Sequence, residues 1–264
     1  MSSPNTHKGA SVKSADRVIA ILELFAHRQK PLNLTEIASE LGYPMSSVLD
    51  LLKSLCASEY LRFNQESKTY MPTLRVPMLG SWIMGELFQN GSIIALMDQI
   101  QKETGETVIL GARNGLHAQY LHTVQSQRLL RYYQKPGQVR PMTQSAVGKA
   151  LLMQFTNNEI SHFILQLNQN TTLERTLVKE QNILEDIRKA RQAGYAMTDR
   201  LTQGICAIGM PLPLYGGTPC AIAVAGPSFR IKRKEDKIVT IIRQLSGMYL
   251  KDASATGLPP VSQP

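Results

Sequence analysis

The sequence is poor in cysteine. Cys56, Cys206 and Cys220 are the only three cysteines among 264 residues, and they form neither a CxxC pair nor a spaced Cys/His set. A zinc site and a disulfide framework are therefore not expected, and we predict no metal ligand. Three scattered cysteines fit a reducing cytoplasm, which is where we expect the protein to act.

A leader and a membrane span are also missing. Residues 1–9 contain no apolar run, which argues against a signal peptide. No uncharged apolar stretch reaches the roughly 20 residues that a helix needs to cross a bilayer. We expect a soluble, cytoplasmic protein that does not attach to a membrane.

Motifs for catalysis and nucleotide binding are absent as well. Gly148-Lys149 lacks the upstream glycine and the following Ser or Thr of a phosphate-binding loop. Ser145 does not lie in a G-x-S-x-G elbow, and no histidine has the context of a catalytic triad. The five histidines are His7, His27, His117, His122 and His162. We therefore expect no enzymatic activity and no cofactor.

Positive charge is in excess, but it is unevenly distributed. The chain has a net charge of +9 and an isoelectric point near 9.5, which allows a polyanionic partner without proving one. Residues 1–75 hold nine Lys and Arg against seven Asp and Glu, a net of only +2. Most of the excess therefore lies later in the chain. The length and the 43% apolar content fit one large or two modest folded domains.

Residues 34–53 predict two short helices joined by a tight turn. Gly42-Tyr43-Pro44 supplies the turn, because Gly accepts a positive φ and Pro suits the start of a helix. Asn33 and Glu36 make a capping-box-like start for the first helix. The apolar positions at helical spacing are Ile37, Ala38 and Leu41 in the first helix, and Val48, Leu51, Leu52 and Leu55 in the second.

This pair is flanked by elements that complete a known motif. Ser14 is expected to cap a preceding helix with apolar residues at 18, 21, 22 and 25. Two short aromatic-rich runs at 60–63 and 69–71, around a polar turn, predict a β-hairpin. Three helices and a hairpin make a winged helix-turn-helix domain at residues 14–75, whose second motif helix would enter a DNA major groove.

The rest of the chain predicts a linker, a mixed domain and a tail. A linker helix at 76–90 is apolar on more than one side, and it would bury the second side either in the core or on a partner subunit. The order of elements predicts an α+β domain with an antiparallel sheet at 91–252, followed by a disordered tail at 253–264. Helices are expected at 92–104, 146–155, 158–167, 179–193 and 230–250, and strands at 107–112, 117–124, 129–133, 195–199, 207–214 and 220–225, with a hairpin turn at 215–219.

Four segments of this domain, together with the winged helix-turn-helix domain before it, resemble the IclR family of bacterial transcriptional regulators. They are 137–152 with its Gly-Lys-Ala-Leu, 187–196 ending in Gly-Tyr-Ala, and the paired strands 204–211 and 221–227. The match runs over roughly residues 14–250 in the family's order. The resemblance implies a C-terminal effector-binding domain of GAF-like fold, a homodimer or homotetramer, and control of catabolic or stress genes.

The helix that begins near Met45 is expected to read DNA. The hydroxyls of Ser46 and Ser47 can reach phosphate or base edges, and Lys53 can neutralise phosphate. The alternative explanation is that the serines cap the helix and that the lysine is a solvated surface residue. The resemblance implies a basic residue at 45 and an arginine at 50, where this chain has Met45 and Asp50. Weaker binding is expected unless Asp50 accepts a hydrogen bond from cytosine N4. The expected DNA-binding residues are Thr35, Met45, Ser46, Ser47, Leu49, Asp50, Lys53, Arg62 and Lys68.

A small molecule is the second expected partner. Residues 107–158 hold six Lys and Arg and no acidic residue, which suits an anionic metabolite but equally a solvated basic face or a DNA-facing surface. The resemblance implies an effector site formed by Met142, Ser145, Ala146, Val147, Asp199, Ala207, Ala223 and Ala225. Some family members offer serines where this chain has Ala223 and Ala225. We therefore favour a larger, aromatic or partly apolar acid, with its acid group met by an arginine.

These features predict a ligand-responsive transcriptional regulator that binds a palindromic operator in double-stranded DNA as an oligomer. Repression is favoured over activation only because it is the more usual role in the family that the sequence resembles. The effector would act by preferring one subunit arrangement and so changing DNA affinity. The alternative is a non-enzymatic sensor or interaction protein whose helix-turn-helix no longer reads DNA sequence.

Overall fold

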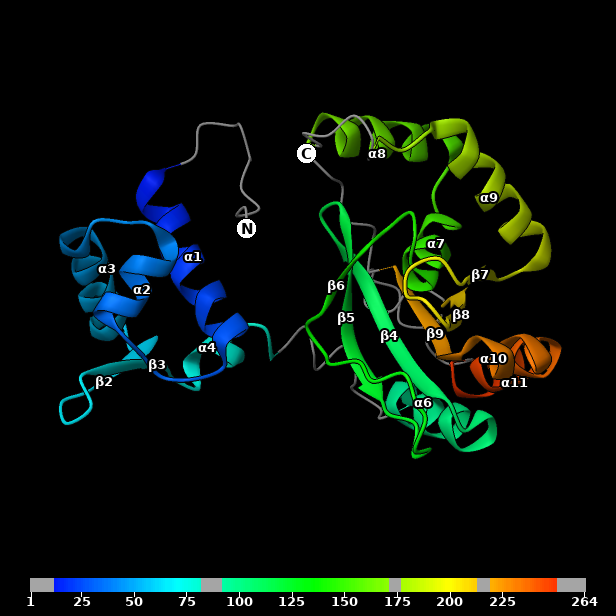
Figure 1. Ribbon diagram of the computed structural model, residues 1–264, viewed down its shortest axis with the longest axis horizontal. Coiled ribbons are helices and arrows are strands. Elements are labelled where there is room, and N and C mark those ends of the chain that lie inside the picture. Colours follow the sequence, from blue (N-terminus) through cyan, green and yellow to red (C-terminus); the bar gives the residue numbers. More distant parts are fainter. Residues whose placement is uncertain (1–11, 82–91, 171–176, 213–218, 251–264) are drawn as a thin grey trace. The chain divides into compact units, whose positions relative to one another are not determined.

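The computed structural model describes residues 12–81, 92–170, 177–212 and 219–250 (Figure 1). The chain divides into two compact units, residues 1–84 and 85–264, called here the N-terminal and C-terminal units. Three predicted features lie wholly or mostly outside the described residues: the linker helix at 76–90, the turn at 215–219 and the tail at 253–264. None of the helices in these described ranges is both long and apolar enough to cross a membrane.

The described part of the N-terminal unit packs three helices against a small sheet. The helices are α1 (Lys13–Arg28), α2 (Leu34–Leu41) and α3 (Met45–Ala57), and the short helix α4 (Arg75–Met78) follows the sheet. The sheet has the order β1-β3-β2, with β1 (Leu32–Asn33), β2 (Leu61–Asn64) and β3 (Thr69–Pro72). The apolar faces of α1, α2 and α3 meet in one core, so the predicted winged helix-turn-helix is confirmed.

Local signals decide where these helices begin and end. The Asn33 side chain accepts from the Glu36 backbone N–H at 2.9 Å, and the Glu36 carboxylate accepts from the Asn33 N–H at 2.8 Å, which confirms the capping box. Gly42 ends α2 with φ of +65°. The predicted cap at Ser14 is wrong: the cap residue is Val12, two residues earlier, and its carbonyl already accepts from the N–H groups of Ala15 and Asp16.

The C-terminal unit is built on one six-stranded antiparallel sheet of order β6-β5-β4-β9-β8-β7. Strands β4 and β9, which come from distant parts of the chain, pair at the centre of the sheet, so the two halves of the unit share one sheet (Figure 1). The strands are β4 (Thr107–Asn114), β5 (His117–Val124), β6 (Val139–Pro141), β7 (Ala196–Thr198), β8 (Ile205–Pro211) and β9 (Cys220–Pro227).

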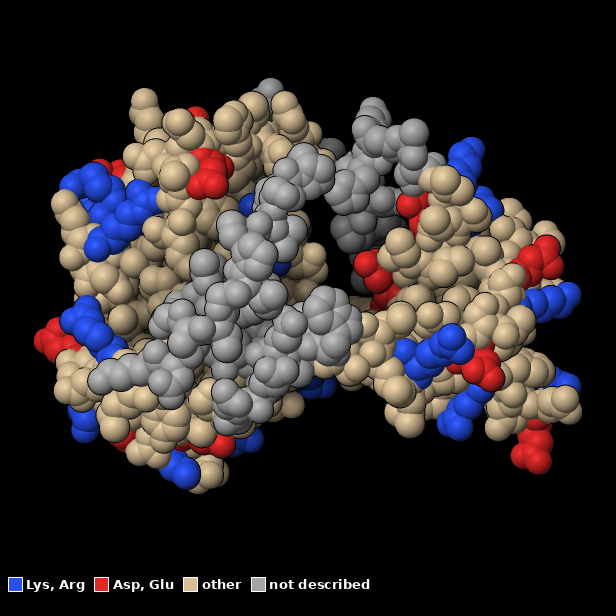
Figure 2. Space-filling view, turned by 180° about the vertical axis from the view of Figure 1, so that it is seen from behind, with Lys and Arg blue, Asp and Glu red and all other residues tan. Residues whose placement is uncertain are grey.

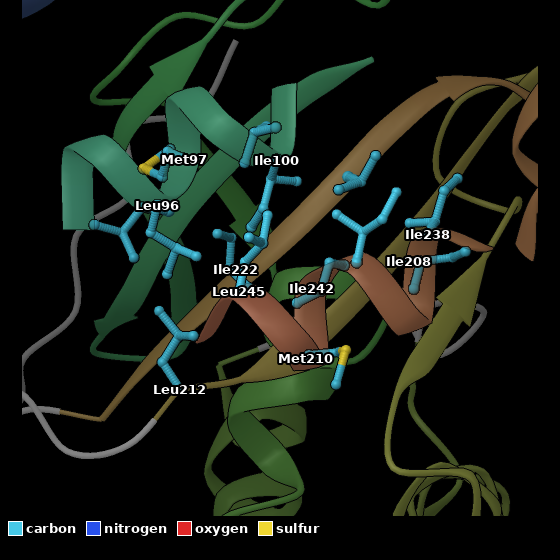
Figure 3. Packing of buried hydrophobic residues seen from close by; sticks show 14 of the residues in the cluster. Leu96, Met97, Ile100, Ile208, Met210, Leu212, Ile222, Ile238, Ile242 and Leu245 are labelled. Atoms are coloured by element: carbon cyan, nitrogen blue, oxygen red, sulfur yellow. The ribbon is translucent and has the colours of Figure 1, made fainter. Parts of the chain in front are cut away.

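Helices cover both faces of this sheet. Side chains alternate along each strand, so Val108 and Leu110 enter one apolar cluster and Ile109 enters the other. The first cluster lies between the sheet and two helices, α6 (Ser92–Thr104) and α11 (Glu235–Tyr249) (Figure 3). The second lies under α7 (Ala146–Leu152), α8 (Asn157–Gln169) and α9 (Glu180–Ala193). This arrangement is the α+β architecture that the order of elements predicts.

Helix α7 lies unusually close to the sheet. Gly209 of β8 faces the first turn of α7, and a Cβ atom at this position would overlap the carbonyl oxygen of Ala146. Gly148 on the helix faces the backbone of Met142 in the same way. Because glycine has no side chain, α7 can rest directly on the backbone of β8 at Gly209 and on the turn after β6 at Gly148. The close approach sets the position of Ala146 and Val147.

Two predicted elements of the C-terminal unit are wrong. The strand expected at 129–133 does not form, since the open edge of β5 pairs instead with β6 and the Arg230 side chain binds the Leu130 carbonyl at 2.7 Å. The single closing helix expected at 230–250 is two helices, α10 (Ser228–Arg233) and α11, separated at Lys234. No glycine or proline marks that break in the sequence.

Candidate DNA-binding surface and effector cavity

One side of helix α3 is exposed, and it is the side predicted to read DNA. Met45 at the start of the helix is 50% exposed, and Ser46, Asp50 and Lys53 are also exposed. Leu49 and Ser47 are half-buried. The opposite side of the helix packs into the core through Val48, Leu52 and Leu55. Four of the predicted residues therefore lie together on one accessible helical face.

The N-terminal turn of α3 is tied to helix α1 by an arginine that sequence reasoning missed. The Arg17 guanidinium donates to the Ser47 hydroxyl at 2.8 Å and lies over the Tyr43 ring, 5.0 Å from its centroid. Ser47 is thus held by an intramolecular hydrogen bond, and Arg17 brings a positive charge to the start of the predicted recognition helix. Arg17 and Ser47 are 30 residues apart, so no local pattern relates them.

The hairpin carries exposed cations beside this helix. Arg62 on β2 and Lys68 in the turn are exposed, as is Thr35 in the first turn of α2. Three other cations of the N-terminal unit are neutralised in the ion pairs Arg28–Glu40, Lys30–Glu36 and Arg75–Glu59. On the face of this unit that Figure 2 shows, basic and acidic side chains are interspersed. Shape and helix exposure, rather than a dense basic patch, mark the predicted DNA-binding surface.

A small cavity opens on the α7 face of the sheet in the C-terminal unit. Its volume is about 20 Å³, close to that of one water-sized probe. It is lined by Ile109, Tyr120, Tyr132, Ala146, Val147, Thr198, Leu201, Thr202, Ile205, Ala207, Ala223 and Ala225. Five of the eight predicted effector residues are therefore brought together here from α7, β8 and β9.

The other three predicted effector residues lie outside the lining. Ser145 caps α7, accepting from the Gly148 N–H at 3.0 Å and donating to the Pro141 carbonyl at 2.9 Å. Met142 is buried against Gly148. Asp199 is exposed and forms an ion pair with Lys232 at 2.6 Å, which lowers the pKa of its carboxyl group.

Hydroxyl groups are the polar feature of the cavity. Tyr120, Tyr132, Thr198 and Thr202 contribute hydroxyls among aliphatic neighbours, and the lining includes no charged side chain. Burial raises the pKa of Tyr120 to about 12, so its hydroxyl stays protonated near neutral pH. Sequence reasoning missed both tyrosines. The alternating pattern of β5 places Tyr120 on the cavity face, whereas Tyr132 lies on a segment wrongly predicted as a strand.

The segment that carries Tyr132 is fixed by a buried ion pair. Glu106 is 1% exposed and accepts two hydrogen bonds from Arg230, at 2.7 and 2.9 Å. Arg230 also donates to the Leu130 carbonyl, and the Thr107 hydroxyl donates to the Tyr132 carbonyl at 2.7 Å. A bidentate arginine–carboxylate pair is both strong and directional. It joins the start of α10 to one wall of the cavity.

The two units together define a class of protein. A winged helix-turn-helix unit with an exposed third helix, joined to a sheet domain that holds an apolar cavity, is the organisation of a DNA-binding regulator with a separate sensory domain. Residues 14–65 match the family model for the IclR helix-turn-helix domain, and residues 92–248 match the model for the C-terminal domain of the bacterial transcriptional regulator IclR. The chain belongs to the IclR family of transcriptional regulators.

Individual relatives are similar over most of the chain. It is 23% identical over 250 residues to the HTH-type transcriptional regulator XynR of Escherichia coli K12, covering 94% of this chain and 98% of XynR. It is 27% identical over 243 residues to the HTH-type transcriptional repressor AllR of the same strain, covering 90% and 87%. An IclR homologue complexed with 4-hydroxybenzoate, from Microbacterium hydrocarbonoxydans, has a TM-score of 0.76 at 16% identity, covering 92% and 100%. This last likeness shows the fold.

Proposed function

We propose that the protein binds a palindromic operator as a homodimer or homotetramer and that a small organic or aromatic acid in the cavity modulates this binding. The exposed face of α3 is the observation that carries the DNA-binding part of the proposal. Repression is the proposed sign, supported by the similarity to the repressor AllR. The proposed domains are 14–75 for DNA, 76–90 as the linker and 91–252 for the effector.

An aromatic ring is the ligand shape that the cavity favours. Its walls are mostly aliphatic, and a related protein is complexed with 4-hydroxybenzoate. A cavity of about 20 Å³ is too small for a ring, since benzene occupies cavities of about 150 Å³ in other proteins. Binding therefore requires that wall residues move, and Leu201 and Thr202 on the connection between β7 and β8 are the proposed ones. Such a movement is how an effector would shift the unit between two states.

Selection of genomic DNA fragments by the purified full-length protein tests the proposal. The experiment uses near-physiological salt and footprints the retained fragments. We expect a shared palindromic site, with adjacent genes that nominate the effector. Retention that depends on salt but not on sequence would favour the alternative, a sensor whose helix-turn-helix no longer reads DNA.

Reversing the charge at Asp50 is expected to tighten DNA binding. Asp50 is exposed on the proposed reading face, so Asp50→Arg replaces a repulsive charge near phosphate with an attractive one. The Kd for DNA should fall by on the order of tenfold at low salt, and the slope of log K against log salt should steepen by about one. Fluorescence anisotropy over a salt series measures both. Glu103→Arg, the same charge change on α6 in the other unit, is the control, and an equal response in both variants would place α3 away from phosphate.

A further inference from the structure

Arg140 lies on the cavity face of the sheet, at its edge. It is the central residue of β6, and its register partner on β5 is Ala118. Cross-strand partners share a face of the sheet, and Tyr120 lies two residues beyond Ala118 on that same face. Arg140 therefore occupies the position next to a tyrosine of the cavity wall. The sheet register, rather than the sequence, brings these two residues together.

The side chains confirm this juxtaposition. The Arg140 guanidinium carbon lies 5.9 Å from the centroid of the Tyr120 ring. Tyr120 is also one of the residues that line the cavity. A cation at this distance from an aromatic face is held by the ring quadrupole. Arg140 thus contacts a residue of the cavity wall without lining the cavity itself.

The charge of Arg140 is not neutralised by any described residue. Its hydrogen bonds go to the side-chain amides of Gln134 at 2.9 Å and Gln138 at 3.4 Å, and to the Val139 carbonyl at 3.5 Å. Its Nε atom is shielded from solvent, and no acceptor among the described residues binds it. Two buried cations among the described residues of the unit differ in this respect, because Lys149 pairs with Asp186 and Arg230 pairs with Glu106.

We propose that Arg140 is the specificity-determining residue for the acid group of the effector, acting together with the Tyr120 hydroxyl. Neutral amides orient the guanidinium without cancelling its charge, so a positive potential extends through Tyr120 to the cavity. The Tyr120 hydroxyl is a neutral donor, and the positive charge of Arg140 beside the ring makes it a stronger one. Both the charge of Arg140 and the Tyr120 hydroxyl strengthen the binding of an acid, whereas only the hydroxyl strengthens the binding of the matching neutral amide. This inference rests on the proposed function, because it assumes that the cavity holds the effector.

Pairs of aromatic acids and their amides test it on the full-length protein. Calorimetry measures binding of 4-hydroxybenzoate and 4-hydroxybenzamide, and of benzoate and benzamide. We expect wild-type protein to bind each acid at least about tenfold more tightly than its amide. Arg140→Gln should remove this preference while leaving amide binding within about twofold, and Arg140→Lys should retain part of it. Lys135→Gln, an exposed cation of the same basic stretch, should change nothing.

A cavity-filling variant and the operator selection separate this inference from the proposed function. Ala223→Leu fills the cavity and should abolish binding of acids and amides alike, with a folded protein verified by its circular dichroism melting curve. Acid preference retained in Arg140→Gln, or acid binding retained in Ala223→Leu, would overturn the role of Arg140. Failure of wild type to bind any of the four compounds would overturn it too. Operator selection is independent of all three results, so the proposed regulator could stand while this inference falls.

Discussion

Replacing Glu106 by glutamine is expected to lower the midpoint of thermal unfolding of the C-terminal unit by roughly 10 °C. The substitution keeps the shape of the side chain but leaves the nearly buried Arg230 guanidinium without its carboxylate. Removing one partner of a buried ion pair costs about 3–5 kcal/mol, because the remaining charge stays desolvated. For a unit of this size each kcal/mol corresponds to about 2–4 °C. Calorimetric melting of the full-length protein measures the shift.

A matched exposed pair provides the control for this prediction. Glu185 also accepts two hydrogen bonds from an arginine, Arg188, both at 2.8 Å, but this pair lies at the surface of α9. Solvent screens such pairs, so Glu185→Gln should leave the melting midpoint nearly unchanged. Equal shifts in the two variants would mean that burial of Glu106 does not set the effect. In the double variant Glu106→Leu and Arg230→Met, stability should partly recover, since no buried charge is left unpaired. The second partner of Glu106, Arg128, is 44% exposed and stays solvated without the carboxylate.

Signals within a few residues of one another predicted most of the fold. The start of α2 follows from Asn33 and Glu36, its end follows from Gly42, and the turn then places α3 at Met45. The bounds of α6 at Ser92–Thr104 and of β5 at His117–Val124 agree with the prediction at both ends. Strong amphipathic periodicity with clear caps leaves little for tertiary contacts to decide.

Long-range contacts account for what the sequence could not show. Residues 129–133 have an apolar pattern suited to a strand, but two of their carbonyl groups are bound by side chains 25 and 100 residues away. The split between α10 and α11 lacks a glycine or proline, and Arg230 just before it is committed to Glu106. Periodicity describes one element at a time, so it cannot reveal that a distant side chain competes for its backbone.

The candidate sites likewise contain residues that local patterns or the family resemblance predict and residues that only tertiary contacts bring into place. The exposed face of α3 follows from helical spacing, because the buried positions fix which side is left outside. Ala223 and Ala225 were named from the family resemblance, and both line the cavity. Arg17, Tyr132 and Arg140 reach their places through tertiary contacts and sheet register. A resemblance transfers the positions of a motif, but it does not predict the residues that this particular chain adds around them.

Gly209→Ala is expected to destabilise the C-terminal unit and to weaken effector binding, although it adds one methyl group. That methyl would overlap the Ala146 carbonyl oxygen, which belongs to the backbone and cannot rotate away. Forced overpacking of this kind costs about 1–3 kcal/mol, which lowers the melting midpoint by roughly 2–12 °C. The first turn of α7 must move off the sheet, and Ala146 and Val147 of the cavity wall move with it. Calorimetry with 4-hydroxybenzoate therefore reports the second effect.

Gly247→Ala is the same chemical change with the opposite expected sign. Gly247 is exposed within α11, and a Cβ atom there meets no other atom within 4 Å. Alanine in an exposed helix position is favoured over glycine by about 0.5–1 kcal/mol, so the melting midpoint should rise by roughly 1–4 °C. Opposite shifts would show that the contact of α7 with the sheet requires glycine at 209. If both variants melted alike and bound ligand alike, α7 could move away from the sheet without cost, and the cavity wall would not depend on the contact at Gly209.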